Sequence, residues 1–318
     1  MEYNMKLHYD IKLFSDTLRA ASQLLDIKLE FVEKDYWITL VLSRLALSKY
    51  VEDTVFKGGT SLAKGYNLIE RFSEDVDLAI VNNGDKTGNE IKTIIRNVEK
   101  EITEELTEIP TEGITSKGSR FRKSVFEYST TEKGNANNKL IVEINSFANP
   151  FPFQKLTIKS MVCDFLTKTD NERYIGQNNL EPFEVNVLSK EQTLLEKLVS
   201  LIRFSLDAEP KESISGKIRH FYDLHFLMTD PECMTFVATD VFKKQFYNLL
   251  QHDKEIFDEP NGWQGKLISE SPLITGFEAV WIAIKGQYQT ELSALAYRQI
   301  PDEKDVAKTF VDLIKRIQ

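Results

Sequence analysis

The stretch Lys57-Gly58-Gly59-Thr60-Ser61-Leu62, followed by Arg71-Phe72-Ser73-Glu74-Asp75-Val76-Asp77-Leu78, decides the fold of this chain. Side chains alternate between the two faces of a strand, so Asp75 and Asp77 project from one face and their apolar neighbours from the other. Two such carboxylates can hold one cation, and Mg²⁺ typically takes one or two carboxylates from a protein. A solvated strand edge is the alternative, but carboxylates in an otherwise apolar strand cost free energy when unpaired. The pattern therefore predicts a metal site.

The glycine pair predicts a tight turn between a strand that ends at Phe56 and a helix that begins near Thr60. Free N–H groups at a helix start favour an anion, for which a triphosphate is the natural candidate. The loop lacks both the P-loop ending and the GxGxxG spacing, and an ordinary strand-to-helix turn explains the glycines alone equally well. The candidate phosphate-binding residues are Lys57, Gly58, Gly59, Thr60 and Ser61.

A third acidic residue, Glu143, stands among apolar residues in Leu140-Ile141-Val142-Glu143-Ile144-Asn145. An unpaired charge on such a strand is costly. Beside Asp75 and Asp77 it would complete a two-metal cluster of Mg²⁺, or of Mn²⁺, which can activate a hydroxyl and neutralise a leaving pyrophosphate. The alternative is an ion pair between Glu143 and a basic neighbour on the sheet.

The composition is that of an ordinary globular protein, with 318 residues, 42% of them hydrophobic and 28% charged. This length makes one large or two ordinary domains. No apolar run is long enough to span a membrane, and the N-terminus lacks the apolar core of a signal peptide, so we expect a cytoplasmic protein without membrane contact. The two cysteines, Cys163 and Cys233, indicate neither a disulfide framework nor a zinc site.

Hydrophobic periodicity predicts an α+β protein with a sheet domain over 1–188, comprising a helical prelude at 1–50 and a sheet core at 51–188, and a helical domain over 189–318. Ser189-Lys190-Glu191-Gln192 is a capping-box start for the first helix of the second domain. Residues 253–273 contain two prolines and two glycines and indicate a long surface connection. We expect helices at 9–26, 28–48 and 90–106, strands at 54–57, 76–81, 155–165 and 183–188, a polar loop at 82–89, and a hairpin of 121–129 and 139–147 joined by the turn-rich 130–138.

The order of these motifs resembles the polymerase-beta-type nucleotidyltransferase superfamily, and within it the AbiEii/AbiGii toxin family. Two later segments are also similar to that family, namely Leu195-Glu196-Lys197-Leu198-Val199-Ser200-Leu201 and Arg219-His220-Phe221-Tyr222-Asp223-Leu224. The resemblance covers roughly residues 30 to 227. One departure is the spacer between Gly59 and Asp75, which is slightly longer than in many superfamily members.

The resemblance implies a short mixed twisted sheet flanked by helices, followed by a mostly helical C-terminal domain. It also implies that Lys197 contacts nucleotide phosphate and that Asp223 acts near the acceptor or the metal, both as catalytic residues. From the residues alone, Lys197 is typical of a solvated helix surface, and Arg219 could pair with Asp223 across one helical turn. The remaining residues that the resemblance places at the nucleotide are Arg71, Ser73 and Arg219.

The implied activity is metal-dependent transfer of a nucleoside monophosphate from a nucleoside triphosphate (NTP) to an acceptor hydroxyl. The resemblance further implies the toxin of a toxin–antitoxin or phage-defence pair, with a cognate antitoxin encoded nearby and tRNA 3′ ends as the acceptor in some relatives. Two alternatives stay open: a small-molecule or protein acceptor, and a module that binds nucleotide without turnover.

The net charge of −9 argues against a globally basic nucleic-acid surface. Residues 114–173 nevertheless carry ten basic and six acidic side chains, with phenylalanines and tyrosine interleaved. Such a segment can contact phosphates and stack bases, and it can equally be a sheet with aromatic residues inside and lysines outside. The sequence thus permits RNA binding without requiring it.

Overall fold

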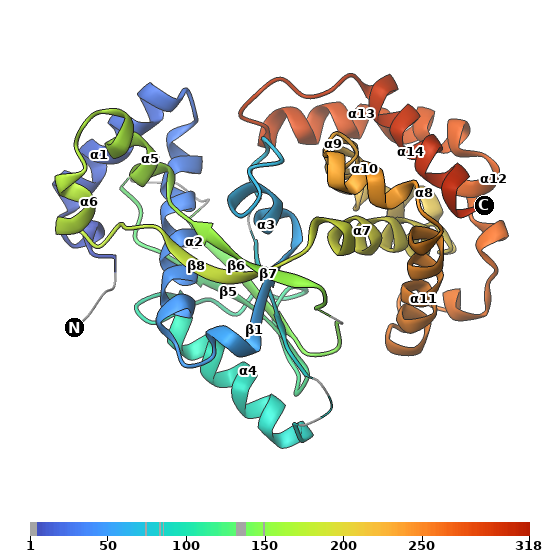
Figure 1. Ribbon diagram of the computed structural model, residues 1–318, viewed down its shortest axis with the longest axis horizontal. Coiled ribbons are helices and arrows are strands. Elements are labelled where there is room, and N and C mark those ends of the chain that lie inside the picture. The colour runs from blue at the N-terminus through green and yellow to red at the C-terminus, as the bar shows by residue number, and fades with distance from the viewer. Residues whose placement is uncertain (1–4, 74, 83, 85, 132–137, 149) are drawn as a thin grey trace. The chain divides into compact units, whose positions relative to one another are not determined.

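The computed structural model describes residues 5–73, 75–82, 84, 86–131, 138–148 and 150–318 (Figure 1). The chain forms two compact units. Unit 1 consists of Met1–Asn67 and Phe72–Leu188, and unit 2 consists of Leu68–Arg71 and Ser189–Gln318. The boundary after Leu188 coincides with the change of periodicity in the sequence. The sequence did not predict that residues 68–71 belong to the second unit.

Unit 1 is built on a mixed sheet with the strand order β3-β5-β6-β2-β1-β8-β7, and β4 pairs with β5. β2 runs parallel to β6 and β1 runs parallel to β8, while the remaining neighbours are antiparallel. The predicted mixed sheet is therefore confirmed. The strands are β1 (Thr54–Lys57), β2 (Asp75–Ile80), β3 (Thr107–Glu108), β4 (Ser116–Lys117), β5 (Phe121–Glu127), β6 (Lys139–Asn145), β7 (Phe153–Ile158) and β8 (Phe183–Leu188).

Two helices, α2 and α4, pack against β6, and α2 also packs against β8. The strand residues of the covered face are fully buried, as Val76, Leu78, Val142 and Ile144 show. This apolar layer fixes which face of each strand is left for polar residues. The helices of unit 1 are α1 (Ile11–Leu25), α2 (Leu29–Leu47), α3 (Gly58–Lys64), α4 (Gly88–Ile102), α5 (Met161–Lys168) and α6 (Arg173–Gln177).

Helix α2 is buried on every side from Phe31 to Leu45, including its charged residues. Asp35 accepts from Lys64 Nζ at 2.5 Å and from the backbone N–H of Met161 at 2.7 Å. Arg44 forms an ion pair with Glu105 at 2.8 Å. Charges inside a core are tolerated when they are paired in this way, so these residues hold α2 among its neighbours.

Unit 2 is helical, as predicted. Ser189 is the N-cap of its first helix and its Oγ accepts from the N–H of Gln192 at 3.2 Å. Aromatic rings of three helices pack together in the core, with Phe221 and Phe310 centroids 4.8 Å apart. The helices are α7 (Lys190–Ser205), α8 (Pro210–Ser215), α9 (Ile218–Leu227), α10 (Pro231–Val237), α11 (Asp240–Ile256), α12 (Pro272–Thr275), α13 (Phe277–Leu295) and α14 (Glu303–Ile317).

The strand predicted at 155–165 is wrong in its second half. Ser160 caps helix α5, with its Oγ accepting from the N–H of Cys163 at 3.0 Å, and this local hydrogen bond ends the extended run. The predicted surface connection at 253–273 is also wrong in part, because α11 continues to Ile256. Trp263 is fully buried, with its indole N–H donating to the carbonyl of Phe257.

Two predicted loops fall partly outside the described residues. The turn of the hairpin contains residues 132–137, and the polar loop at 82–89 contains residues 83 and 85. Helix α4 begins at Gly88, with Thr87 and Glu90 forming a capping box. None of the helices in the described part of the chain combines the length and the apolar character needed to cross a bilayer.

Candidate active site

The polar face of the sheet in unit 1 carries a row of charged residues that crosses four neighbouring strands. Lys57 on β1 is in register with Asp77 on β2, Asp77 with Glu143 on β6, and Glu143 with Lys123 on β5. Residues in register on adjacent strands project from the same face, with Cβ atoms about 4.5–5.5 Å apart. We call these four residues, with Asp75 two positions before Asp77, the charged row.

The alternation of each strand explains why the charges gather on this face. Asp75 and Asp77 are half-buried on β2, while the residues between and after them are fully buried beneath the helices. Glu143 is likewise half-buried between fully buried Val142 and Ile144. A shift of one residue in register would bury the carboxylates in the apolar layer, so the packing of the opposite face holds the row in place.

Gly58 lies directly against the Asp77 carboxylate. Its φ is +81°, and a Cβ atom built on it would lie 2.1 Å from Asp77 Oδ2. Both features require glycine here, because L side chains rarely adopt this φ and no non-bonded carbon approaches an oxygen so closely. The predicted tight turn is present, and its glycine gives Asp77 the space it occupies.

Thr60 and Ser61, predicted to bind phosphate, are buried with 2% and 0% of their surface exposed. The Thr60 hydroxyl donates to the backbone carbonyl of Asp75, and the Ser61 hydroxyl donates to the carbonyl of Gly58 at 2.9 Å. The Thr60 side chain therefore joins the start of α3 to β2, and the Ser61 side chain stabilises the first turn of α3. Nucleotide binding by the turn remains a prediction. In the turn itself, the side chains of Thr60 and Ser61 hold the backbone in position.

The pKa of Asp77 is raised to about 8. Burial is the largest cause, and the negative charges of Glu143 and Asp75 add to it, while Lys57 and Lys123 oppose it. The neighbouring lysines therefore leave Asp77 with an excess of negative charge around it. Such an excess favours a bound cation or a proton.

Glu143 has a direct partner in this row. Its Oε2 lies 3.3 Å from Lys123 Nζ, as in the ion pair that the sequence left open as the alternative. Among the residues that the structure describes, no group of three or more His, Cys, Asp or Glu side chains is arranged to hold a metal ion. The metal set of Asp75, Asp77 and Glu143 therefore stays a prediction.

In unit 2, Asp223 is fully buried and accepts three charged hydrogen bonds. Arg71 donates through Nε to Oδ1 and through Nη2 to Oδ2, each at 2.7 Å, and Lys197 Nζ lies 2.7 Å from Oδ2. Burial alone would raise the pKa of Asp223, but Arg71 and Lys197 lower it far below its usual range. The structure thus brings three predicted site residues together as a buried ion cluster.

Arg219 does not pair with Asp223, although the two residues are one helical turn apart. It lies at the surface of α9, where its Nε is 3.0 Å from Glu291 Oε1. The ion pair that the helical spacing allowed as an alternative is not formed, because Asp223 points into the core, where Arg71 and Lys197 occupy its oxygens. Ser73, also a predicted nucleotide-binding residue, is half-buried just before β2.

Residues 68–71 are fastened within unit 2 by backbone contacts as well as by Arg71. The N–H of Tyr297 donates to the carbonyl of Glu70 at 3.1 Å, and the N–H of Glu70 donates to the hydroxyl of Tyr222 at 3.3 Å. Arg71 also forms an isolated β-bridge with Ala296. The Asp223 cluster is therefore one of several contacts that anchor residues 68–71 within unit 2.

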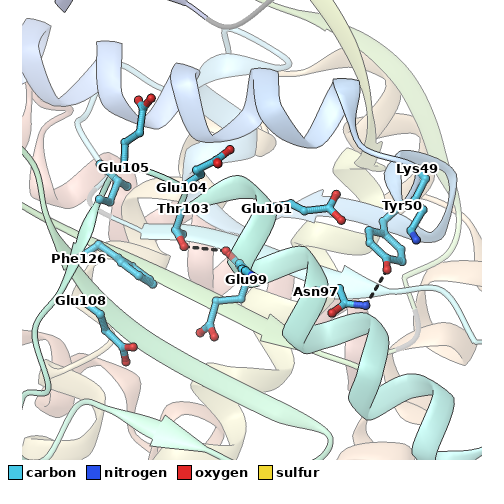
Figure 2. A pocket seen from close by; sticks show the side chains of 12 residues that line it. Lys49, Tyr50, Asn97, Glu99, Glu101, Thr103, Glu104, Glu105, Glu108 and Phe126 are labelled. Atoms are coloured by element: carbon cyan, nitrogen blue, oxygen red, sulfur yellow. Dashed lines mark hydrogen bonds between the residues drawn. The ribbon is translucent and has the colours of Figure 1, made fainter. Parts of the chain in front are cut away.

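A separate acidic cavity of about 600 Å³ lies along α4 (Figure 2). None of the predicted site residues lines it. Its carboxylates include Glu99, which accepts from Arg122 Nε at 2.7 Å and from the Ser124 hydroxyl at 2.6 Å. Glu105, also in its wall, pairs with Arg44. Glu99 and Glu105 thus stabilise contacts within unit 1.

Lys123 is the member of the charged row that the sequence analysis did not assign to the site. In the sequence it is one of the ten basic residues of 114–173. The predicted hairpin placed its strand beside that of Glu143, but the register depends on the length of the connecting turn. The register between the two strands cannot be read from the sequence, and a shift of one residue would place Lys123 on the opposite face.

A family model described as the nucleotidyl transferase AbiEii toxin of type IV toxin–antitoxin systems matches residues 40–309. No curated protein matches the chain. Among solved structures, MenT4, a nucleotidyltransferase toxin from Mycobacterium tuberculosis H37Rv, is similar with 15% identity and a TM-score of 0.46. That alignment covers 90% of this chain and 94% of MenT4.

The protein is a nucleotidyltransferase. It belongs to the AbiEii family of toxins of type IV toxin–antitoxin systems, which confirms the family that its motifs resemble. The match extends through most of unit 2, well beyond the last motif found in the sequence.

We expect Gly58→Ala to abolish activity by displacing the Asp77 carboxylate. Gly113→Ala is the matched control, because Gly113 has a φ of +76° with open space around its Cα. Both variants carry backbone strain of about 1–2 kcal/mol, but only Gly58→Ala introduces the clash. Melting temperature and nucleotidyl transfer should be measured together. Equal activity of the two variants would show that the space beside Asp77 is not needed.

We expect Asp223→Asn to lower the free energy of unfolding at pH 7 by about 3–5 kcal/mol, because Arg71 and Lys197 would lose a buried counter-charge. The native pKa of Asp223 is lowered, so its stabilisation is complete above the unfolded pKa of about 3.9 and is lost as the pH falls below it. Urea unfolding between pH 7 and pH 2.5 should show the difference between wild type and variant shrinking below pH 4. Exposed Asp312→Asn on α14 is the control, and a difference independent of pH would contradict the assignment.

Proposed function

We propose that the protein transfers a nucleoside monophosphate from an NTP to the 3′-terminal hydroxyl of a tRNA and releases pyrophosphate. In this reaction the acceptor oxygen bonds to the α-phosphorus while the bond from that phosphorus to the pyrophosphate oxygen breaks. The observation that carries the proposal is the pair of carboxylates Asp75 and Asp77 on one strand face, with Gly58 packed against the second. Family membership supports the reaction type.

The charged row suits a divalent cation, since its acidic members outnumber its lysines and raise the pKa of Asp77. Asp75 and Asp77 would hold Mg²⁺, or Mn²⁺, through hard oxygen ligands. When bound, the cation would neutralise negative charge on the phosphates during transfer. The turn at Gly58 would keep Asp77 in place, and Lys57 adds a positive charge in register with Asp77.

The tRNA acceptor is supported by the family resemblance more than by surface charge. Of the basic residues between 114 and 173, several pair with carboxylates, so their charge is already balanced. The pairs are Lys117–Glu108, Arg122–Glu99, Lys123–Glu143, Lys155–Glu52 and Lys159–Asp164. The described part of this segment therefore carries less unbalanced positive charge than its composition indicates.

We further propose that the protein acts in the cytoplasm, where tRNA and NTPs are available, and that a cognate antitoxin opposes it. The family description of a type IV toxin–antitoxin system supports the antitoxin. Loss of usable tRNA would stop translation, which would suit a role in phage defence. A reading frame for a small antitoxin beside the gene, whose co-expression restores growth, would support this part.

The proposed reaction is tested by incubating purified protein with Mg²⁺, each of the four α-labelled NTPs and total cellular RNA. We expect label in tRNA, and we expect Asp77→Asn to lower the rate at least about a hundredfold because a ligand of the cation is lost. Asp16→Asn, on the exposed face of α1, is the matched control and should retain full activity.

Label in a small molecule or in protein, with none in RNA, would contradict the tRNA acceptor and favour the first alternative. Nucleotide binding without pyrophosphate release in any acceptor mixture would contradict transfer altogether. Sequencing of RNA 3′ ends after induced expression of wild type and Asp77→Asn would identify the tRNA and count the added nucleotides.

A further inference from the structure

A buried ion pair lies at the end of α3 that is remote from the Gly58 turn. Lys64 is the last residue of this helix, and its Nζ lies 2.5 Å from Asp35 Oδ1 of α2. Both side chains are more than nine-tenths buried. The same ammonium donates to the backbone carbonyl of Lys159 at 3.0 Å, and Asp35 Oδ2 accepts from the N–H of Met161 at 2.7 Å. The pair therefore joins α2, α3 and the chain between β7 and α5.

Stability alone is a weak reason for an ion pair in this position. Removing two charges from water costs free energy, and an apolar pair of similar volume is often as stable as a buried ion pair. An ion pair adds a fixed distance and direction between the elements that carry it. Asp35 and Lys64 therefore fix where the end of α3 lies relative to α2.

Helix α3 connects this ion pair to the charged row. It has seven residues with a rise of about 1.5 Å each, so its first and last residues are about 9 Å apart. At its start, Gly58 packs against the Asp77 carboxylate, and the Thr60 hydroxyl donates to the backbone carbonyl of Asp75. Hydrogen bonds between successive turns make so short a helix move as one body. A shift or rotation at Lys64 is therefore passed on to Gly58.

The same side of α2 also supports the segment that leads into β2. Phe31, Lys34 and Asp35 are three and four positions apart, which places them on one side of the helix. The Phe31 ring stacks on the Phe72 ring with centroids 4.8 Å apart, and Lys34 Nζ lies 5.8 Å from the Phe72 centroid. Helix α2 thus holds both α3 and the approach to β2, the two segments that meet at the charged row.

We propose that Asp35 and Lys64 are positioning residues for nucleotidyl transfer, which fix the end of α3 and thereby the place of Gly58 against the Asp77 carboxylate. They act through α3 and not on the substrate. This role rests on Asp75 and Asp77 as the acids of the proposed function. Failure of that function would appear in the wild type, or as an Asp77→Asn variant with the wild-type rate, whereas failure of the positioning role would appear only in variants of the ion pair.

The test uses the full-length double variant Asp35→Asn with Lys64→Met, which removes the ion pair and leaves neither charge unpaired. The amide introduced at position 35 can still accept from the N–H of Met161. α3 also keeps its contacts with the sheet, because Gly65 packs closely against Leu156 and Val187. We therefore expect the double variant to fold, with a melting temperature within a few degrees of the wild-type value.

Two measurements report on position and on the reaction, both at a temperature well below the melting transition. Hydrogen exchange followed by mass spectrometry should show the amides at the end of α3 exchanging about tenfold faster than in wild type, with those of α4 unchanged. The rate of label transfer at saturating NTP, with Mg²⁺ and total cellular RNA, should fall about tenfold because Gly58 no longer holds Asp77 in place. Lys64→Arg keeps the charge and should retain most of the wild-type rate.

Arg44→Met is the matched control, because Arg44 lies on the same helix and forms another buried ion pair, with Glu105 at 2.8 Å. This variant should lower the melting temperature without changing the exchange of α3 or the transfer rate. A merely structural ion pair would behave in the same way at Asp35 and Lys64. The double variant is expected to show the reverse, a normal melting temperature with a low rate.

Three results would overturn the positioning role. The first is a double variant with wild-type exchange in α3 and a wild-type transfer rate. The second is faster exchange in α3 with an unchanged rate, since the place of α3 would then not matter to the reaction. The third is a lower rate with unchanged exchange, which would mean that Asp35 or Lys64 acts directly on a substrate.

Discussion

Repulsion among the carboxylates of one sheet face is the constraint on which the candidate site depends. Asp77 stands between Asp75 on its own strand and Glu143 on the next, and burial together with these charges raises its pKa. The apolar layer beneath α2 and α4 prevents the strands from shifting to relieve this repulsion, since a shift would bury the acids. Hydrophobic packing on one face thus stabilises an electrostatically unfavourable arrangement on the other. Natural sites retain such conflicts where a ligand resolves them.

In unit 2, direct partners balance the negative charge of Asp223. It is also a buried aspartate, but Arg71 and Lys197 satisfy both of its oxygens and lower its pKa. In the structure described here the charges of Arg71 and Lys197 are therefore already balanced. The motifs of unit 2 that resemble the family contribute first to a closed ion cluster, which holds the segment 68–71 against α9. In the charged row of unit 1, by contrast, three acidic groups stand beside two lysines.

Much of this could be predicted from local sequence, and the failures have a common cause. The pair Asp75 and Asp77, the Gly58 turn and the Ser189 cap are local patterns, and the structure shows each element where its pattern placed it. The partners of Glu143 and Asp223 depend on contacts between distant parts of the chain, which alternation and helical spacing do not determine. The i,i+4 spacing of Arg219 and Asp223 suggested a pair, but only one of them faces the core.

Asp77 and its neighbour Glu143 differ in their surroundings. Glu143 Oε2 lies 3.3 Å from Lys123 Nζ on β5, whereas burial and the charges of Glu143 and Asp75 raise the pKa of Asp77. In the proposed function, a divalent ion that approaches the row would replace the proton favoured on Asp77, and at Glu143 it would compete with Lys123. Strand register sets this arrangement, since it places Lys57 opposite Asp77 and Lys123 opposite Glu143.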